Sequence, residues 1–105
     1  MWRCKTCTPV PEGVRRTADV LERRYAVSIV YASYQGCTRF TEFRRALGGE
    51  VPPRTLAQRL VELEHAGVLR REVRDSRPPL VEYVLTSDGR RLGALVEALA
   101  AWSRA

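Results

Sequence analysis

The sequence predicts a mainly α-helical fold that carries one small β-hairpin. Apolar residues recur at helical spacing through most of the 105-residue chain, and they alternate at period two in one stretch only, between Leu69 and Leu85. A chain of this length forms one hydrophobic core, so we expect one domain. Residues 1–11 contain two prolines and no apolar period, which indicates an N-terminal arm, and residues 12–105 are expected to form the domain.

Two helices are expected before Gly36. The first runs from Glu12 to about Arg24, where apolar residues fall at helical spacing and charged residues occupy the other faces. Its apolar positions are Val14, Ala18, Leu21 and Tyr25. The segment 25–35 is apolar on almost every side. That pattern favours a buried central helix, while a buried strand remains an alternative for so short a run.

Two further helices are predicted between Phe40 and Gly67. The third is short, with Phe40, Phe43 and Leu47 on one face. We expect Thr41 to cap its start and Gly48-Gly49 to end it. The fourth spans residues 53–66 and starts at Pro53, because a proline at the first helical position gives up only an N–H that would be unpaired.

The fourth helix buries one apolar face. Leu56, Leu60 and Leu63 share that face, and Gly67 lies where a C-terminal cap belongs. Two helices joined by a turn that contains glycine are typical of a helix-turn-helix.

A β-hairpin and a last helix complete the domain. Residues 69–74 and 81–85 alternate in polarity on either side of turn residues 75–79. Thr86 is expected to cap one final helix that reaches the chain end. The apolar stripe of this helix comprises Leu92, Leu95, Val96, Leu99 and Trp102. A hairpin directly after a helix-turn-helix is a winged helix arrangement.

Three sequence blocks resemble the HxlR-type winged helix-turn-helix transcription regulators of bacteria. They are residues 39–43 (RFTEF), residues 53–64 (PRTLAQRLVELE) followed by 67–71 (GVLRR), and residues 79–89 (PLVEYVLTSDG). The resemblance implies a homodimer, formed by the first and last helices, that binds palindromic operator DNA. Where many members have a polar cap before the recognition helix this chain has Pro52, and where many have a Cys-Pro pair it has Glu12.

The charge of the chain also points to double-stranded DNA as the partner. Eighteen basic residues against twelve acidic ones give a net charge of +6, and all but Lys5 of the basic residues are arginines. We expect four residues of the fourth helix to read bases: Arg54, Thr55, Gln58 and Arg59. Four arginines around the third helix and the hairpin turn are expected to contact phosphates: Arg39, Arg44, Arg74 and Arg77.

The first and last helices carry more apolar surface than a domain of this size needs, which favours a dimer interface. The residues expected there are Val14, Ala18, Leu21, Leu92, Leu95, Val96, Leu99 and Trp102. A two-fold axis would place two recognition helices about 34–36 Å apart, one turn of DNA.

Cys4 and Cys7 are candidates for redox sensing, since Arg3 and Lys5 beside them favour a thiolate. An inert arm is the simpler alternative. Two ligands do not make a zinc site, so we expect no metal, and we expect no cofactor and no enzymatic activity. No apolar run is long enough to span a membrane and no signal peptide is evident, so a cytoplasmic location is expected. The rival function is a winged helix that binds a protein instead of DNA.

Overall fold

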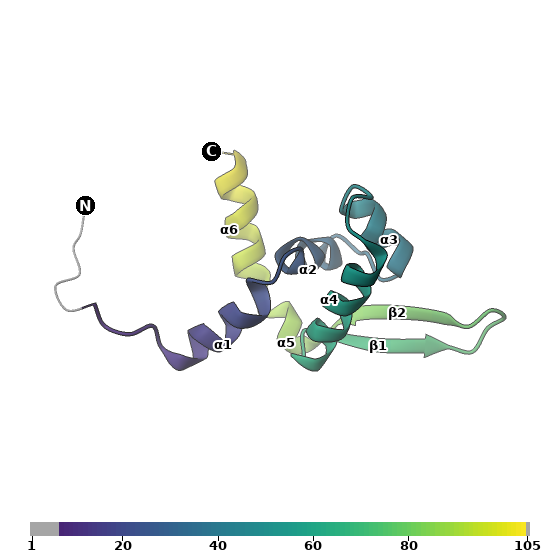
Figure 1. Ribbon diagram of the computed structural model, residues 1–105, viewed down its shortest axis with the longest axis horizontal. Coiled ribbons are helices and arrows are strands. Elements are labelled where there is room, and N and C mark those ends of the chain that lie inside the picture. The colour runs from purple at the N-terminus through teal and green to yellow at the C-terminus, as the bar shows by residue number, and fades with distance from the viewer. Residues whose placement is uncertain (1–6, 105) are drawn as a thin grey trace.

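The computed structural model describes residues 7–104, and this part of the chain forms six helices and one two-stranded hairpin (Figure 1). The elements are α1 (Glu12–Leu21), α2 (Ala26–Tyr34), α3 (Phe40–Ala46), α4 (Pro53–His65), β1 (Leu69–Arg74), β2 (Leu80–Leu85), α5 (Ser87–Arg90) and α6 (Gly93–Arg104). The mainly helical fold with one hairpin is therefore confirmed. Figure 1 shows the hairpin extending to one side of the body, while α1 and α6 leave the body on the other side.

Helix α2 is the centre of the molecule. It contacts α1, α3, α4, α6 and β2. Ile29 and Val30 of α2 pack with Phe43 of α3, the three leucines of α4 and Leu69 of β1 in one buried cluster. The helical interpretation of this apolar run is confirmed, because a segment surrounded by five elements has to be apolar on nearly every side.

The first helix is shorter than the sequence indicated, because α1 ends at Leu21 and α2 starts at Ala26. Tyr25, between them, has a φ of 73°, in the left-handed region that interrupts a right-handed helix. The guanidinium of Arg24 lies 4.9 Å from the centre of the Tyr25 ring. This cation–π contact covers the turn.

The predicted cap of α3 is wrong. Thr41 lies inside the helix, and the N-cap residue is Arg39. The free backbone N–H groups of Thr38 and Arg39 donate to Oε1 of Glu42, at 2.9 and 3.0 Å. A carboxylate in the first turn caps the helix because it satisfies both orphan donors and opposes the positive end of the helix dipole.

The start and the end of α4 agree with the sequence. Pro52 gives no side-chain cap, and Pro53 occupies the first turn. Gly67 follows with a φ of 82°, which glycine adopts without steric cost.

The predicted last helix is two helices. Thr86 caps α5 as expected, accepting from the Gly89 N–H at 2.9 Å. The chain then turns at residues 91–92 before α6 begins. The hydroxyl of Tyr34 donates to the Gly89 carbonyl oxygen at 2.7 Å, and its ring lies 3.5 Å from the Cβ position of Gly93. The Gly89 carbonyl oxygen, which a continuous helix would offer to the Gly93 N–H, therefore accepts from the Tyr34 hydroxyl and from the Leu92 N–H instead.

The strands of the hairpin pair in antiparallel register, with Leu69 opposite Leu85 and Arg74 opposite Leu80. Among residues 7–104, no helix combines the length and the apolar character needed to cross a membrane.

Candidate nucleic-acid interface

Helix α4 presents a polar face on the side opposite its buried leucines. Leu56, Leu60 and Leu63 are fully buried, whereas Arg54 and Gln58 are exposed and Thr55 is partly exposed. Arg54 and Gln58 are one turn apart, so their side chains lie next to each other on the helix surface. A guanidinium and a carboxamide in this position match the donor and acceptor groups at the edges of guanine and adenine.

Arg59 is held differently from the other three residues expected to read bases. Its Nε donates to the carbonyl oxygen of Arg24 at 3.0 Å, and its Nη1 lies 3.3 Å from Oε1 of Glu62. The side chain is only 19% exposed. Arg59, which the sequence places among the base-reading residues, is therefore bound within the chain instead, because the α1–α2 turn supplies an acceptor beside α4.

Glu62 is the centre of this contact. Its Oε2 accepts from Nε2 of Gln58 at 3.2 Å and lies 3.8 Å from Nη1 of Arg23. One carboxylate thus connects the exposed face of α4, Arg59 and the end of the α1–α2 turn. Sequence reasoning missed this role, although Glu62 is at i+3 from Arg59 and i+4 from Gln58, the two spacings at which helical side chains meet.

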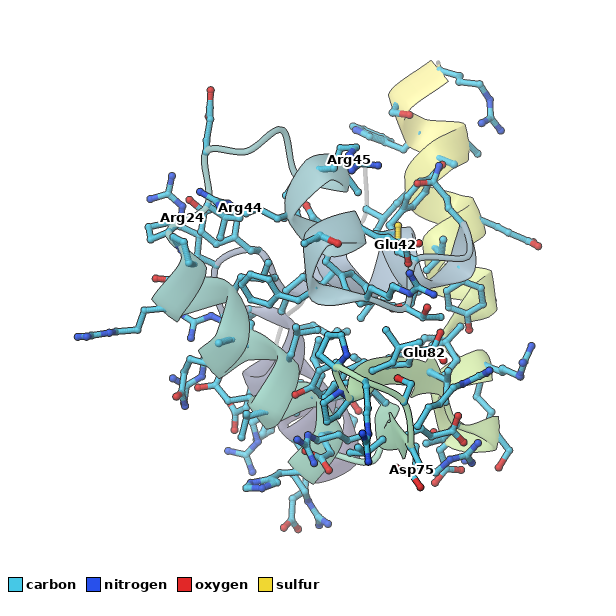
Figure 2. All side chains as sticks on the ribbon, turned by 90° about the vertical axis from the view of Figure 1, so that its right-hand side faces the viewer. Arg24, Glu42, Arg44, Arg45, Asp75 and Glu82 are labelled. Atoms are coloured by element: carbon cyan, nitrogen blue, oxygen red, sulfur yellow. The ribbon has the colours of Figure 1, made fainter. Side chains whose placement is uncertain are left out.

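The arginines of α3 add positive charge next to α4. Arg39 and Arg44, both expected to contact phosphates, are exposed, and so is Arg45. Figure 2 shows Arg24 and Arg44 extending to the same side of the molecule, with Arg45 further along α3. Arg24 and Arg45 were not singled out from the sequence, where nothing distinguishes them from other surface arginines.

The hairpin contributes the remaining two predicted arginines. Arg77 is exposed in the turn, next to Pro78. Arg74 is largely exposed, and its Nε lies 2.7 Å from Oε1 of Glu82, whose side chain is only 12% exposed. The stem of Arg74 is thus anchored while its outer nitrogen atoms still face solvent.

Glu82 also joins the hairpin to the start of α3. Its Oε2 accepts from the hydroxyl of Thr38 at 2.8 Å, and the Tyr83 N–H donates to the Thr38 carbonyl oxygen at 2.7 Å. Thr38 in turn donates to Glu42, and Figure 2 shows Glu42 on α3 and Glu82 on β2 one above the other. The backbone hydrogen bonds of Thr38 and Arg39 hold the pKa of the Glu42 carboxyl below its ordinary value, so Glu42 keeps its charge.

Half of the eight residues expected at a dimer interface are exposed. Trp102 is 82% exposed, Val14, Leu95 and Leu99 are exposed as well, and Ala18 is partly exposed. Helix α1 buries none of its residues. The expectation that Val96 lies at the dimer interface is wrong, because this residue is only 8% exposed and belongs to the core. Leu21 and Leu92 are partly buried and also pack against the core. Val96 lies one turn after Leu92, on the side of α6 that contacts α2.

The cysteines occupy different environments. Cys4 lies outside the described residues. Cys7 is exposed, whereas Cys37 is partly buried, and that burial, followed by the charge of Glu42, raises the pKa of its thiol. Within residues 7–104, no three His, Cys, Asp or Glu side chains come together as a metal site would require.

Comparisons with known proteins agree with this arrangement. Residues 20–105 match the family model described as HxlR-like helix-turn-helix. The chain is 34% identical over 88 residues to the HTH-type transcriptional regulator YvaP of Bacillus subtilis, covering 84% of this chain and 81% of YvaP. It is 38% identical over 100 residues to the HTH-type transcriptional regulator YybR of the same organism, covering 93% of this chain and 79% of YybR.

Among solved structures, the oxidized form of the redox regulator HypR superimposes with a TM-score of 0.80 at 37% identity. The superposition covers 88% of this chain and 94% of that one.

Proposed function

We propose that this chain, which belongs to the HxlR-like helix-turn-helix family, binds a palindromic DNA operator as a homodimer and so regulates transcription. Its similar proteins are HTH-type transcriptional regulators. What we propose for this chain is that it makes sequence-specific DNA contacts, that it assembles with two-fold symmetry, and that particular residues carry these roles.

The exposed pair Arg54 and Gln58 on α4 carries the proposal. Both side chains stand on a helix whose opposite face is locked in the core by three leucines. A helix held this way presents its polar face to the major groove as a rigid unit, and we assign base reading to Arg54 and Gln58, with Thr55 beside them. Arg59 supports the surface by fixing α4 to the Arg24 carbonyl.

The proposed complex also includes phosphate contacts on both sides of α4. Arg39 and Arg44 lie on the α3 side, and Arg74 and Arg77 lie on the hairpin. Such contacts position a domain on the duplex without reading sequence. The ion pair with Glu82 limits the rotamers of Arg74, so less side-chain entropy is lost on binding.

The exposed apolar residues of α1 and α6 support the homodimer. Helix α1 has no fully buried residue in the isolated chain, and Trp102 on α6 lies almost fully in solvent. Helices α1 and α6 extend from the body on the side away from the hairpin (Figure 1). A two-fold contact between these helices therefore keeps both copies of α4 free for DNA.

Thiol control is a refinement of this function. HypR is a redox regulator, and exposed Cys7 is accessible to an oxidant in this chain. The test compares operator affinity with and without diamide in the parent protein and in Cys7→Ser. Thiol control is supported if diamide lowers the operator affinity of the parent protein but not that of Cys7→Ser. It is contradicted if diamide leaves the affinity of the parent unchanged.

One selection experiment tests the main proposal. Duplexes bound by the full chain are recovered from a random pool and sequenced. We expect a palindrome with half-site centres one helical turn apart, about 10 base pairs. Recovery of unrelated sequences, or of none, favours the rival in which this winged helix binds a protein.

The base-reading assignment is tested on the recovered operator with Arg54→Ala, Gln58→Ala and the matched control Arg90→Ala. Arg90 is exposed on α5, so Arg90→Ala changes the net charge as much as Arg54→Ala does and leaves α4 untouched.

A further inference from the structure

Glu62 places a carboxylate on the helix that we propose to read DNA, although the phosphates of a duplex repel a negative charge. Two arginines compensate this charge. Nη1 of Arg59 lies 3.3 Å from Oε1 of Glu62, and Nη1 of Arg23 lies 3.8 Å from its Oε2. The three side chains together remain positive, so Glu62 does not turn this surface against DNA.

The Glu62 carboxylate is also held in one position. Nε of Arg59 donates to the Arg24 carbonyl oxygen at 3.0 Å, and Nη1 of the same guanidinium donates to Oε1 of Glu62. Because the guanidinium is planar and rigid, fixing its Nε also fixes the direction of Nη1. Glu62 is therefore held by a side chain that is itself anchored to the α1–α2 turn.

This fixed carboxylate decides how the carboxamide of Gln58 is turned. Oε2 of Glu62 accepts from Nε2 of Gln58 at 3.2 Å. A carboxylate accepts hydrogen bonds only, so it excludes the flipped amide, in which two oxygen atoms would face each other. The oxygen and the nitrogen leave the amide carbon in different directions. Oε1 of the exposed Gln58 is therefore presented away from Glu62 as an acceptor, and Nε2 keeps a second N–H to donate.

An amide in this orientation selects adenine among the four bases. In the major groove adenine offers the N6–H donor next to the N7 acceptor, which match an outward amide oxygen and an N–H. Guanine offers the two acceptors O6 and N7 side by side, and thymine offers O4, so each would meet the amide oxygen with another acceptor. Cytosine offers the N4–H donor alone. A glutamine that is free to flip loses this distinction, because its amide can then turn either the oxygen or the N–H groups outward.

Building on the proposed DNA binding, we infer that Glu62 is a positioning residue that fixes the carboxamide of Gln58 to read adenine in each half-site. The contacts run from the Arg24 carbonyl through Arg59 and Glu62 to Gln58. The base preference at one operator position thus depends on a carboxylate that contacts Gln58 and not the base.

The random-pool selection, repeated with the full chain carrying Glu62→Gln, Gln58→Ala or Glu64→Gln, tests the inference. Glu62→Gln keeps the size of the side chain, but its amide both donates and accepts, so both orientations of the Gln58 amide become possible. Glu64→Gln is the matched control. It removes the same charge from the same helix, at a position neither three nor four residues from Gln58.

We expect adenine at the operator position that Gln58→Ala relaxes. There the parent should prefer adenine over guanine by about tenfold in affinity, and Glu62→Gln should bring this ratio to within about twofold. Glu64→Gln should leave the ratio unchanged. Fluorescence anisotropy on the operator and its single-base variants gives the ratios, which a change in the folded fraction of a variant does not alter.

A double variant separates positioning from any other role of Glu62. In a Gln58→Ala background, Glu62→Gln should have no further effect on the preference at this position, because the amide through which it acts is missing. Relaxation of a different position by Glu62→Gln would mean that Glu62 contacts a base itself and would overturn the inference. So would an unchanged ratio in Glu62→Gln, a base other than adenine at the Gln58 position, or a Gln58→Ala variant that relaxes no position.

Failure of this inference is distinguishable from failure of the proposed function. A parent protein that selects a palindrome, with the same preference in Glu62→Gln, refutes the positioning role alone. A parent protein that selects no sequence refutes the proposed DNA binding and the positioning role with it.

Discussion

The guanidinium of Arg59 donates a hydrogen bond to the backbone carbonyl oxygen of Arg24, 3.0 Å away. The two residues are 35 positions apart, and their contact fixes the polar helix α4 against the turn that ends the first helix. Arg59 therefore has a structural duty that Arg54, one and a half turns earlier, does not have.

Arg59→Ala should lower the free energy of unfolding by about 1–2 kcal/mol, because a hydrogen bond from a charged group is lost. Arg54→Ala, the matched control on the same helix, should change it by less than about 0.5 kcal/mol. Urea denaturation followed by circular dichroism measures both values. Equal stability of the two variants would contradict the structural role of Arg59.

Arg54→Ala and Gln58→Ala should each weaken operator binding by about 1–3 kcal/mol and relax the preference at one position of each half-site. Binding to an unrelated duplex should change much less with Gln58→Ala, since no charge is removed. Fluorescence anisotropy on both duplexes gives the ratio. Base reading by Arg54 or Gln58 is contradicted if the alanine variant loses equal binding free energy on the operator and on unrelated DNA, and no more than Arg90→Ala loses.

Arg77→Ala should weaken binding to all duplexes alike. For each subunit that loses one phosphate contact, the slope of log affinity against log salt should become shallower by about 0.9. A salt titration on operator and unrelated DNA checks this. An unchanged slope would show that Arg77 does not touch a phosphate.

Glu42 should make the stability depend on pH. Its pKa is lowered in the folded chain, so the stabilisation is fully present above the pKa of the unfolded chain and is lost as the pH falls through the folded value. Urea midpoints of the parent and of Glu42→Gln should differ most near neutral pH and converge on acidification. A difference that stays constant down to acidic pH would be inconsistent with this cap.

Cys7 should react with iodoacetamide faster than Cys37 at neutral pH. Cys7 is exposed, whereas burial and the charge of Glu42 raise the pKa of the Cys37 thiol and so reduce its thiolate fraction. Mass spectrometry of a Cys4→Ser protein sampled over time gives both rates. The order should disappear after denaturation in urea, and faster labelling of Cys37 in the folded protein would refute the expectation.

The features that the sequence predicted well are those set by neighbours along the chain. The leucine spacing of α4, Pro53 at its start and Gly67 after its end are local signals, and each has the predicted position. The alternation in the hairpin is local in the same sense.

The features that were missed depend on residues far away. At the break between α5 and α6, the Gly89 carbonyl oxygen accepts from Tyr34, which is 55 positions away in the sequence. The acceptor of Arg59 belongs to a turn that no spacing reveals, although Arg59 lies three residues after Leu56 and four before Leu63, on the flank of the buried face. The cap of α3 could have been found, since Glu42 comes three residues after Arg39, where a capping carboxylate belongs.

Gly89 lies so close to the base of the hairpin that a Cβ there would stand 2.2 Å from the carbonyl oxygen of Val68. The hydroxyl of Tyr34 donates to the carbonyl oxygen of the same glycine, and the hydroxyl of Thr86 donates to the carbonyl oxygens of Gly67 and Val68. The connection between the hairpin and the last helix is thus held rigidly by close packing and hydrogen bonds. In a homodimer, the two α4 helices would therefore keep one fixed separation. An operator with a longer or shorter spacer between its half-sites would have to change the twist of its own double helix to fit.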